Sequence, residues 1–361
     1  MKRMLCIVSS LDTGGAETMM MKFFRSFPDE YKMDFIVSKE SGYYEEEVLQ
    51  RGGIIYRVPL RTEHPIKTFM AIKKVVKDNN YKSVLKLCDT PKGYFDLLAA
   101  KCGGAKKLCV RSCNASAQQG KFSKLFCDIL RPIFNHITDV KIAPSLLAAE
   151  FTFGKECVNN KDVFLLHNAL DLEYFQFSER ARREVREELG IMADQIVYGH
   201  IGRFNQQKNH GFLLEVFYQI VKQDRKAVLL LVGDGELREP IKNKIEEMGL
   251  QPNVLFLGVR SDIPRILSAM DYFVFPSLYE GMPNTVIEAQ ATGLPCAVSD
   301  SITKEAKIMD NIHYYSLKES PKVWAANIVD SDKTREKDQE KLREAGYDIN
   351  EVCAEFLKLI F

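Results

Sequence analysis

Residues 271–299 read DYFVFPSLYEGMPNTVIEAQATGLPCAVS, and this stretch decides the fold class. The aromatic and β-branched run at 271–275 predicts a short buried strand. Asn284 is expected to cap the helix that follows, and Gly293 stands where a left-handed residue would end it. The apolar run at 295–299 predicts a second strand. A strand, a helix and a strand in this order are typical of a parallel βαβ unit.

The same alternation of short apolar strands and amphipathic helices extends along nearly the whole chain. The first half has strand candidates at 3–9, 33–38, 54–58, 83–88, 107–112, 139–143 and 162–166. The second half has them at 195–201, 227–232, 254–257, 271–275 and 295–299. Helical periodicity fills the gaps, so we expect an α/β protein with two doubly wound parallel sheets.

The seam between the two sheets is expected near 167–180, where HNALDLEYFQFSER interrupts the periodicity. Two domains also fit the length, because 361 residues exceed the ~250–300 at which single cores stop growing. We therefore expect Rossmann-like domains at 1–170 and 171–345. The segment 346–361 reads as a final amphipathic helix that could pack back on the N-terminal domain.

Composition and charge exclude several classes of protein. A net charge of +1 gives no electrostatic reason to expect nucleic acid as a partner. The nine cysteines include no C-x-x-C pair, so neither a zinc site nor a disulfide framework is indicated and a reducing cytoplasm is favoured. The apolar run in MKRMLCIVSS is too short for a signal peptide, and no stretch approaches the ~20 apolar residues of a membrane-spanning helix.

Positive charge is concentrated in one segment. From Arg61 to Arg131 there are 15 Lys and Arg against 5 Asp and Glu, a net of +10. Within it, KFSKLFCDILRPIF (121–134) interleaves apolar and basic residues as an interfacial helix does. A plain core helix with a solvated basic side would look the same. Together the two features favour an anionic surface or ligand, because basic residues near a surface attract anionic lipid.

Two glutamates flank the Gly-Met-Pro-Asn turn of the opening stretch. Glu280 is expected in the loop and Glu288 about one turn into the helix. A helix N-terminus can hold an anion, and carboxylates beside it can accept hydrogen bonds from hydroxyls. Phosphate together with hydroxyls suggests a nucleotide sugar. Ordinary surface glutamates on a solvated helix are the alternative.

Two further strand-to-helix turns carry residues suited to phosphate. Gly14 and Gly15 follow the first strand, and adjacent glycines allow a backbone to approach a phosphate or sugar closely. Arg203 and Lys208 follow the strand at 195–201 and could clamp a diphosphate from two sides. A glycine turn without ligand and ordinary surface cations are the alternatives.

These loops, in this order, resemble the retaining glycosyltransferases of family 4, which have the GT-B fold. The resemblance rests on TGGAE (13–17), HNALDLEYF (167–175), HIGRFNQQKNH (200–210), LVGDGELRE (231–239), FLGVRSDIPRIL (256–267) and SLYEGMPNTVIEAQATGLPCAVSDSITKE (277–305). It covers essentially the whole chain. It implies two Rossmann-like domains facing each other across a cleft, with the acceptor side at 1–170 and the nucleotide-sugar donor side at 171–345. The most specific motif is typical of enzymes that build bacterial capsules and exopolysaccharides.

The resemblance also implies a role for each matching residue. Arg203 and Lys208 would bind the donor diphosphate, and Glu288 would take the ribose hydroxyls. Glu280 would hold the transferred sugar. The remaining donor-side positions would be Gly14 and Gly15 over the phosphates, the backbone at Val259 and Arg260 facing the base, and the amides of the run Gly281, Met282, Pro283, Asn284 and Thr285 beside the sugar.

The implied reaction retains anomeric configuration through an oxocarbenium-like state, and the leaving phosphate takes the acceptor's proton. It requires no metal and no cofactor. The only D-x-D match, 330–332, reads as solvated surface. One departure concerns the acceptor side, where many relatives carry a histidine and this chain has Cys113. Either the imidazole is dispensable, or Asp89 takes its role, or activity has been lost.

The expected donor is a nucleotide sugar, with a UDP-sugar favoured. The expected acceptor is a lipid-diphosphate-linked or other glycan at the inner face of the cytoplasmic membrane. Three alternatives remain open. They are a catalytically silent partner subunit that binds nucleotide sugar, a sugar-nucleotide epimerase of the same fold, and a Rossmann oxidoreductase. The last lacks a dinucleotide fingerprint.

Overall fold

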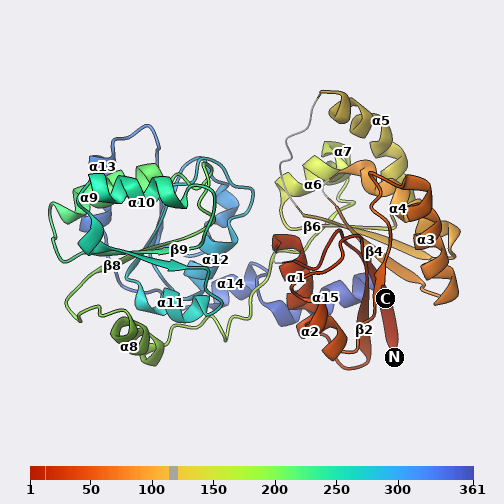
Figure 1. Ribbon diagram of the computed structural model, residues 1–361, viewed down its shortest axis with the longest axis horizontal. Helices are drawn as coiled ribbons and strands as arrows, with labels where there is room; N and C mark the ends of the chain where they lie inside the picture. Colours follow the sequence, from red (N-terminus) through yellow and green to blue (C-terminus); the bar gives the residue numbers. More distant parts are fainter. Residues whose placement is uncertain (13, 89, 114–120) are drawn as a thin grey trace. The chain divides into compact units, whose positions relative to one another are not determined.

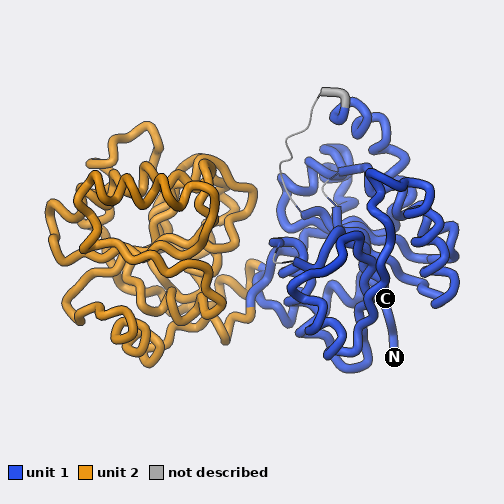
Figure 2. The backbone as a smooth tube through the Cα atoms, viewed as in Figure 1, with its two compact units in different colours: residues 1–170, 346–361 blue, residues 171–345 orange. Residues whose placement is uncertain are grey.

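The computed structural model describes residues 1–12, 14–88, 90–113 and 121–361, and Figure 1 shows their secondary structure. The chain divides into two compact units, each with its own sheet (Figure 2). Unit 1 comprises Met1–Leu170 and Gly346–Phe361, and unit 2 comprises Asp171–Ala345. The predicted α/β architecture with two parallel sheets is confirmed.

Unit 1 contains seven parallel strands in the order β3-β2-β1-β4-β5-β6-β7. They are β1 (Lys2–Ile7), β2 (Tyr31–Val37), β3 (Ile55–Arg57), β4 (Ser83–Cys88), β5 (Lys107–Ser112), β6 (Val140–Ala143) and β7 (Phe164–Leu165). The order runs outward in both directions from the pair β1 and β4, so the sheet is doubly wound. Sheets of this kind bind ligands beyond the carboxyl ends of their strands.

Helices cover both faces of the unit 1 sheet (Figure 1). They are α1 (Gly15–Arg25), α2 (Glu45–Gln50), α3 (Pro65–Asp78), η1 (Pro91–Gly93), α4 (Tyr94–Cys102), α5 (Lys121–Ile137), α6 (Leu146–Phe153), α7 (Lys155–Asn159) and α15 (Ile349–Ile360). Successive residues of a strand point to opposite faces. Accordingly, Met4 and Cys6 pack with α1 and α15, whereas Leu5 and Ile7 pack with α3 and α4.

The final helix α15 is part of unit 1. Phe356 stacks on Phe23 of α1 with ring centroids 4.7 Å apart and planes at 11°. The amide of Leu170 donates to the carbonyl of Tyr347 (2.8 Å), and the amide of Ile349 donates to the carbonyl of Leu170 (2.9 Å). These contacts hold residues 346–361 against the rest of unit 1, which otherwise ends at Leu170.

Unit 2 contains six parallel strands in the order β10-β9-β8-β11-β12-β13. They are β8 (Val197–Ile201), β9 (Val228–Val232), β10 (Val254–Gly258), β11 (Tyr272–Phe275), β12 (Cys296–Ser299) and β13 (Ile312–Tyr315). The sequence did not predict β13, because IHYY is short and mixes polar with aromatic residues. It becomes a strand by pairing with β12, where Ile312 lies opposite Cys296.

The helices of unit 2 also lie on both faces of the sheet (Figure 1). They are α8 (Glu179–Glu188), α9 (His210–Val221), α10 (Arg238–Glu247), η2 (Gln251–Asn253), α11 (Ile263–Ala269), α12 (Asn284–Ala291), η3 (Lys304–Ala306), α13 (Pro321–Asp330) and α14 (Glu340–Glu344). Across the described residues of both units, no helix combines the length and apolar character needed to span a bilayer.

The ends of α12 show one correct and one wrong prediction. Asn284 is the first helical residue and not the cap, because the carbonyl of Pro283 already accepts from the amide of Val286 (3.0 Å). Gly293 ends the helix as predicted, with φ 70°. Its amide donates to Gln290, the arrangement that satisfies the last carbonyls of a helix.

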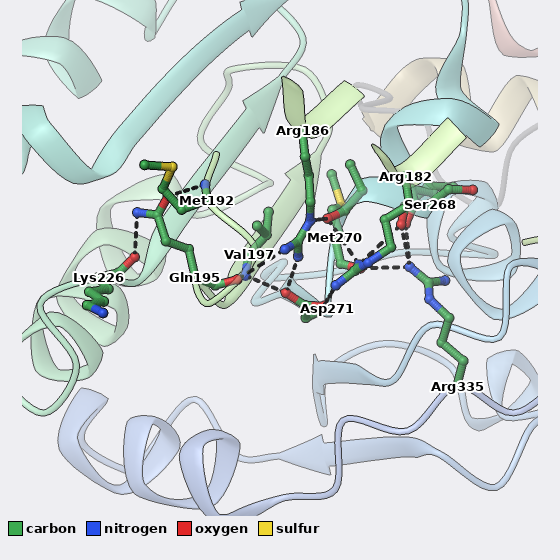
Figure 3. Close-up of polar contacts among 12 residues, drawn as sticks. Arg182, Arg186, Met192, Gln195, Val197, Lys226, Ser268, Met270, Asp271 and Arg335 are labelled. Carbon is green, nitrogen blue, oxygen red and sulfur yellow. Dashed lines mark hydrogen bonds and ion pairs between the residues drawn. The ribbon is translucent and has the colours of Figure 1, made fainter. Parts of the chain in front are cut away.

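A cluster of arginines around Asp271 anchors β11 in unit 2 (Figure 3). Arg182 and Arg186 of α8 each place Nη2 2.5 Å from one carboxylate oxygen of Asp271. The amide of Val197 in β8 donates to the same carboxylate (2.7 Å). Arg335 donates to the carbonyl of residue 270 (2.7 Å). The segment preceding β11 is thus tied to α8, to β8 and to the chain beyond α13.

Candidate functional site

Four loops of unit 2 follow the carboxyl ends of the adjacent parallel strands β10, β9, β8 and β11. They therefore lie at one edge of the sheet, the edge where open α/β sheets bind ligands. This edge collects the residues predicted for the donor in unit 2: Arg203, Lys208, Val259, Arg260, Glu280, Gly281, Met282 and Pro283 on the loops, and Asn284, Thr285 and Glu288 on α12.

The loops after β8 and β11 are hydrogen-bonded to each other. The amide of Leu278 donates to the carbonyl of Gln207 (2.8 Å), and the Gln207 side chain donates to the carbonyl of Tyr279 (2.9 Å). Asn209, in the left-handed region at φ 55°, donates from its side chain to the carbonyl of Pro276 (3.1 Å). These bonds hold Lys208 and Glu280 next to each other, although 72 positions separate them in the sequence.

Lys208 and Glu280 form the central ion pair of this edge. Lys208 Nζ lies 2.7 Å from Glu280 Oε1, and their side chains are only 15% and 11% exposed. The ammonium group also lies 4.6 Å from the centroid of the Phe275 ring. The lysine stem crosses Gly202, where an added Cβ would lie 3.2 Å from Cδ and Cε. The pair is thus held by both loops and by the last residue of β11.

Arg203 is on the same edge but is largely solvent-exposed. Its side chain is 72% exposed, and Nη2 lies 3.4 Å from Glu236 Oε2 in the loop after β9. Gly233 allows that loop to approach, because it has φ 131° and a Cβ there would collide with the carbonyl of Gly202. Arg203 is therefore free to reorient toward an anion, whereas Lys208 is already fixed.

Glu288 is half-buried on α12, and the hydroxyl of Thr285 in the first turn is buried with no hydrogen-bond partner among the described residues. Gly281 and Met282 are also half-buried, and Pro283 is buried. The two glutamates, predicted to serve different parts of a ligand, therefore differ in setting: Glu280 is paired with Lys208 in a loop, and Glu288 stands within the helix.

Val259 and Arg260 lie in the loop after β10 and differ from each other. Val259 is 80% exposed. The Arg260 side chain turns away to Asp262, with Nε 2.8 Å from Oδ1, and to Glu188 of α8 at 3.2 Å. The Asp262 carboxylate raises the pKa of Arg260 above its usual value. The Arg260 side chain is therefore engaged, whereas the backbone of this loop and the exposed Val259 side chain are available to a ligand. That the backbone here faces the base stays a prediction.

The unit 1 residues occupy the carboxyl edge of the other sheet. Gly14 precedes α1, and a Cβ there would collide with the carboxylate of Glu17, whereas Gly15 has open space around it. Cys113 follows β5 and is half-buried, and its thiol donates to the carbonyl of Arg111 (3.6 Å). Asp89 lies outside the described residues.

Arg111 is a feature that sequence reasoning missed. It is 1% exposed at the end of β5, and Nη2 donates to Asn168 Oδ1 (2.9 Å) and to the carbonyl of Leu166 (3.3 Å). Its guanidinium lies 5.7 Å from the Phe23 ring. Burial lowers the pKa of Arg111. The available signal was an arginine two positions before Cys113, near the end of a predicted strand.

Two buried histidines pack against the Lys208 loop. His200 of β8 and His210 of α9 have ring centroids 4.7 Å apart, and they are 0% and 2% exposed. His200 Nδ1 lies 2.9 Å from the carbonyl of Val274. Burial, followed by the cation of Lys208, lowers the pKa of His210 to about 4. Both rings are therefore neutral near pH 7.

Comparison with known proteins identifies similar sequences and folds. Residues 195–330 match the family model described as glycosyl transferases group 1. The chain is 34% identical to the putative glycosyltransferase EpsF of Bacillus subtilis (strain 168), over 96% of this chain and 93% of that protein. It is 36% identical to the UDP-Gal:alpha-D-GlcNAc-diphosphoundecaprenol alpha-1,3-galactosyltransferase of Escherichia coli, over 43% of this chain and 44% of that protein.

A solved structure shows the same fold over the full length. The crystal structure of Anabaena Alr3699/HepE in complex with UDP aligns with a TM-score of 0.80 at 19% identity, over 99% of each chain. The structural likeness confirms the predicted fold class.

Proposed function

Since this chain belongs to the group 1 glycosyltransferases, with the GT-B fold, we propose that it transfers a sugar from a UDP-sugar to a lipid-linked glycan with retention of configuration. The full-length similarity to EpsF supports a role in exopolysaccharide or related glycan synthesis. Unit 2 would bind the donor and unit 1 the acceptor.

The observation that carries this proposal is the Lys208–Glu280 pair at the carboxyl edge of unit 2. Lys208 is held in place before any donor arrives, with its charge neutralised by Glu280 at 2.7 Å. A diphosphate would supply a second set of anionic oxygens, and charge-assisted contacts of this kind are strong where water is excluded. Glu280 would then accept hydrogen bonds from hydroxyls of the transferred sugar.

The other residues of this edge would complete the donor site. Arg203 would swing from Glu236 to the diphosphate, because its present ion pair is exposed and weak. Glu288 would accept from the ribose hydroxyls. The backbone at Val259 and Arg260 would face the base, and the segment from Gly281 to Thr285 would lie beside the sugar. Gly14 and Gly15 would contribute from unit 1.

In the reaction, Lys208 and Arg203 would stabilise the negative charge that develops on the departing diphosphate. The sugar would pass through an oxocarbenium-like state, and the acceptor would enter on the face that the diphosphate leaves. Its hydroxyl proton would go to the leaving phosphate. No metal is needed in this scheme, because the two cations supply the charge stabilisation.

The acceptor proposal rests on a relative and on unit 1. The Escherichia coli relative acts, by its name, on a diphosphoundecaprenol-linked sugar. In unit 1, helix α5 exposes four large apolar side chains, at 45 to 66% of their surface: Leu125, Phe126, Ile129 and Ile133. The surrounding segment carries a net charge of +10. We infer a cytoplasmic protein that docks peripherally on an anionic membrane.

The direct test is incubation with a panel of UDP-sugars and GDP-sugars and a lipid-diphosphate-linked acceptor, read by mass spectrometry. Product should form with a UDP-sugar, in the presence of EDTA, and proton NMR of the product should show the donor's anomeric configuration. Inverted product would refute retention, and loss of product with EDTA would refute metal independence. Tight UDP binding without transfer to any acceptor would favour the alternative of a catalytically silent partner subunit. That alternative rests on Cys113 alone.

A further inference from the structure

A cavity of about 320 Å³ in unit 1 is lined by residues of α3, α4 and α5, the helices labelled in Figure 1, and by none of the residues assigned to the donor. Its volume lies at the small end of the ~300–1,000 Å³ range of ligand pockets. The loop after β3 and the η1 turn after β4 contribute to its wall, so it lies near the carboxyl edge of the unit 1 sheet. We call it the phenylalanine pocket.

The apolar wall of the phenylalanine pocket consists of three rings from three helices. Phe69 comes from α3, Phe95 from α4 and Phe126 from α5. Phe69 packs partly against the core, whereas Phe95 and Phe126 are 41% and 45% exposed. Leaving two phenylalanine rings in water is unfavourable, and a hydrocarbon chain laid between the rings would bury them.

The polar wall carries an excess of positive charge. Asp96 is buried, and its carboxylate lies 3.1 Å from Arg61 Nη1 and 3.1 Å from Lys86 Nζ. Lys92 lines the same pocket. Two cations therefore pair with Asp96 and Lys92 adds a third positive charge, so the excess charge favours an anion.

Two of these cations retain free donors. Arg61 makes both of its contacts through Nη1, to Asp96 and to the carbonyl of Lys92 (2.9 Å), so its Nε and Nη2 have no protein acceptor among the described residues. Among the described residues, Lys92 Nζ donates one hydrogen bond, to Ser123 Oγ (2.9 Å). A guanidinium fixed in this way is ready to bind phosphate oxygens.

We propose that the phenylalanine pocket binds a single hydrocarbon chain next to its phosphate, and that this ligand is the lipid end of the acceptor. Arg61 and Lys92 bind the phosphate, and the three rings hold the first units of the chain. The volume admits one chain and not the two of a diacyl phospholipid, which favours a polyprenyl carrier. This inference deepens the proposed function and rests on its lipid-linked acceptor.

The binding test uses the full chain and soluble single-chain probes, measured by titration calorimetry. Farnesyl diphosphate and decyl phosphate should bind, whereas decanol and inorganic phosphate, each with half of the chemistry, should bind at least about tenfold more weakly. Lysophosphatidylglycerol separates the two lipid sources. If it binds as well as farnesyl diphosphate, the pocket serves bulk phospholipid and the acceptor assignment is overturned.

Matched variants assign the binding to the pocket. Lys92→Gln and Phe126→Ser should each weaken farnesyl diphosphate about tenfold or more, because one removes a charge-assisted contact and the other an apolar wall. Lys101→Gln on the exposed surface of α4 and Ile129→Ser on α5, which do not line the pocket, should bind within about twofold of the parent. Equal weakening by Phe126→Ser and Ile129→Ser would show nonspecific adsorption to the α5 surface and overturn the proposal.

Turnover distinguishes the failure of this inference from failure of the proposed function. In the parent, transfer to a prenyl-diphosphate-linked sugar should have a lower KM than transfer to the same sugar without lipid, and Lys92→Gln should remove that difference while leaving UDP affinity unchanged. If the parent transfers sugar but Lys92→Gln and Phe126→Ser keep the low KM, the pocket is refuted and the glycosyltransferase function stands. If no transfer occurs but farnesyl diphosphate still binds the parent and the control variants more tightly than the pocket variants, the proposed function is refuted. The pocket then stands as a lipid-binding site only.

Discussion

Lys208 Nζ lies 2.7 Å from Glu280 Oε1, and this ion pair joins the loops after β8 and β11 at the carboxyl edge of unit 2. Both side chains are largely shielded from solvent, so each charge depends on the other. A cation prepared in this way needs little reorganisation when a diphosphate arrives, which is the condition for strong electrostatic stabilisation. The pair therefore links the stability of the site to its proposed chemistry.

Replacing Lys208 should weaken UDP binding. Lys208→Ala removes a charge-assisted contact worth ~1.5–3 kcal/mol, so UDP affinity should fall by about one to two decades in titration calorimetry. Lys226→Ala is the matched control, because Lys226 is exposed in the same unit and its ammonium forms an ion pair with Asp194. Unchanged UDP affinity in Lys208→Ala would refute the diphosphate assignment.

The two glutamates should separate by role. Glu288→Gln should weaken UDP binding, because a neutral amide is a poorer acceptor for the ribose hydroxyls. Glu280→Gln should leave UDP affinity nearly intact and lower kcat, since its proposed partner is the transferred sugar. Calorimetry with UDP and steady-state kinetics measure the two effects. Parent-like behaviour of both variants would support the alternative of ordinary surface glutamates.

Removing the carboxylate at Asp271 should destabilise unit 2. Asp271→Asn leaves Arg182 and Arg186 without their anionic partner in a mostly buried cluster, and the expected loss in the free energy of unfolding is about 3 kcal/mol. Urea denaturation followed by fluorescence of the single Trp324, which lies in unit 2, measures this loss. The exposed pair at Asp194 gives the control, since Asp194→Asn should leave the free energy of unfolding close to that of the parent.

Acid should destabilise the protein partly through His210. Burial lowers its pKa from 6.5 to about 4, so as pH falls the unfolded chain takes up the proton first. The stability contributed by neutral His210 is therefore present above about pH 6.5 and is lost between about 6.5 and 4. His210→Phe should reduce the fall in the free energy of unfolding across this window by about 3 kcal/mol. An unchanged slope in His210→Phe would contradict the assignment.

Membrane docking through unit 1 should depend on salt. Raising ionic strength from about 0.1 M to about 1 M shortens the screening length from ~10 Å to ~3 Å, so sedimentation with phosphatidylglycerol vesicles should decrease. Lys124→Glu on the exposed side of α5 should weaken binding at low salt, and Lys226→Glu in unit 2 should not. Binding that ignores salt and Lys124→Glu, or no binding by the parent, would favour a soluble acceptor.

Much of the fold could be predicted because its signals are local. Runs such as 227–232 are apolar and β-branched, and Gly293 ends α12 for a reason of backbone conformation that the sequence shows directly. Two predictions failed for reasons that the structure shows. The strand β13 is short and mixed in polarity, and it forms by pairing with β12. Asn284 is the first helical residue rather than the cap, because the carbonyl of Pro283 already accepts a hydrogen bond from an amide of α12.

The candidate site was predictable as a set of loops but not as a geometry. The sequence by itself determined that Arg203, Lys208, Glu280 and Glu288 follow strands of one parallel sheet, because strand periodicity and chain order place such loops at one edge. Their proposed roles remain predictions. Only the tertiary structure decided that Lys208 pairs with Glu280 while Arg203 stays exposed, that Arg111 is buried, and that three helices enclose the phenylalanine pocket. Those features depend on contacts between segments far apart in the chain, and such contacts leave no periodic trace in the sequence.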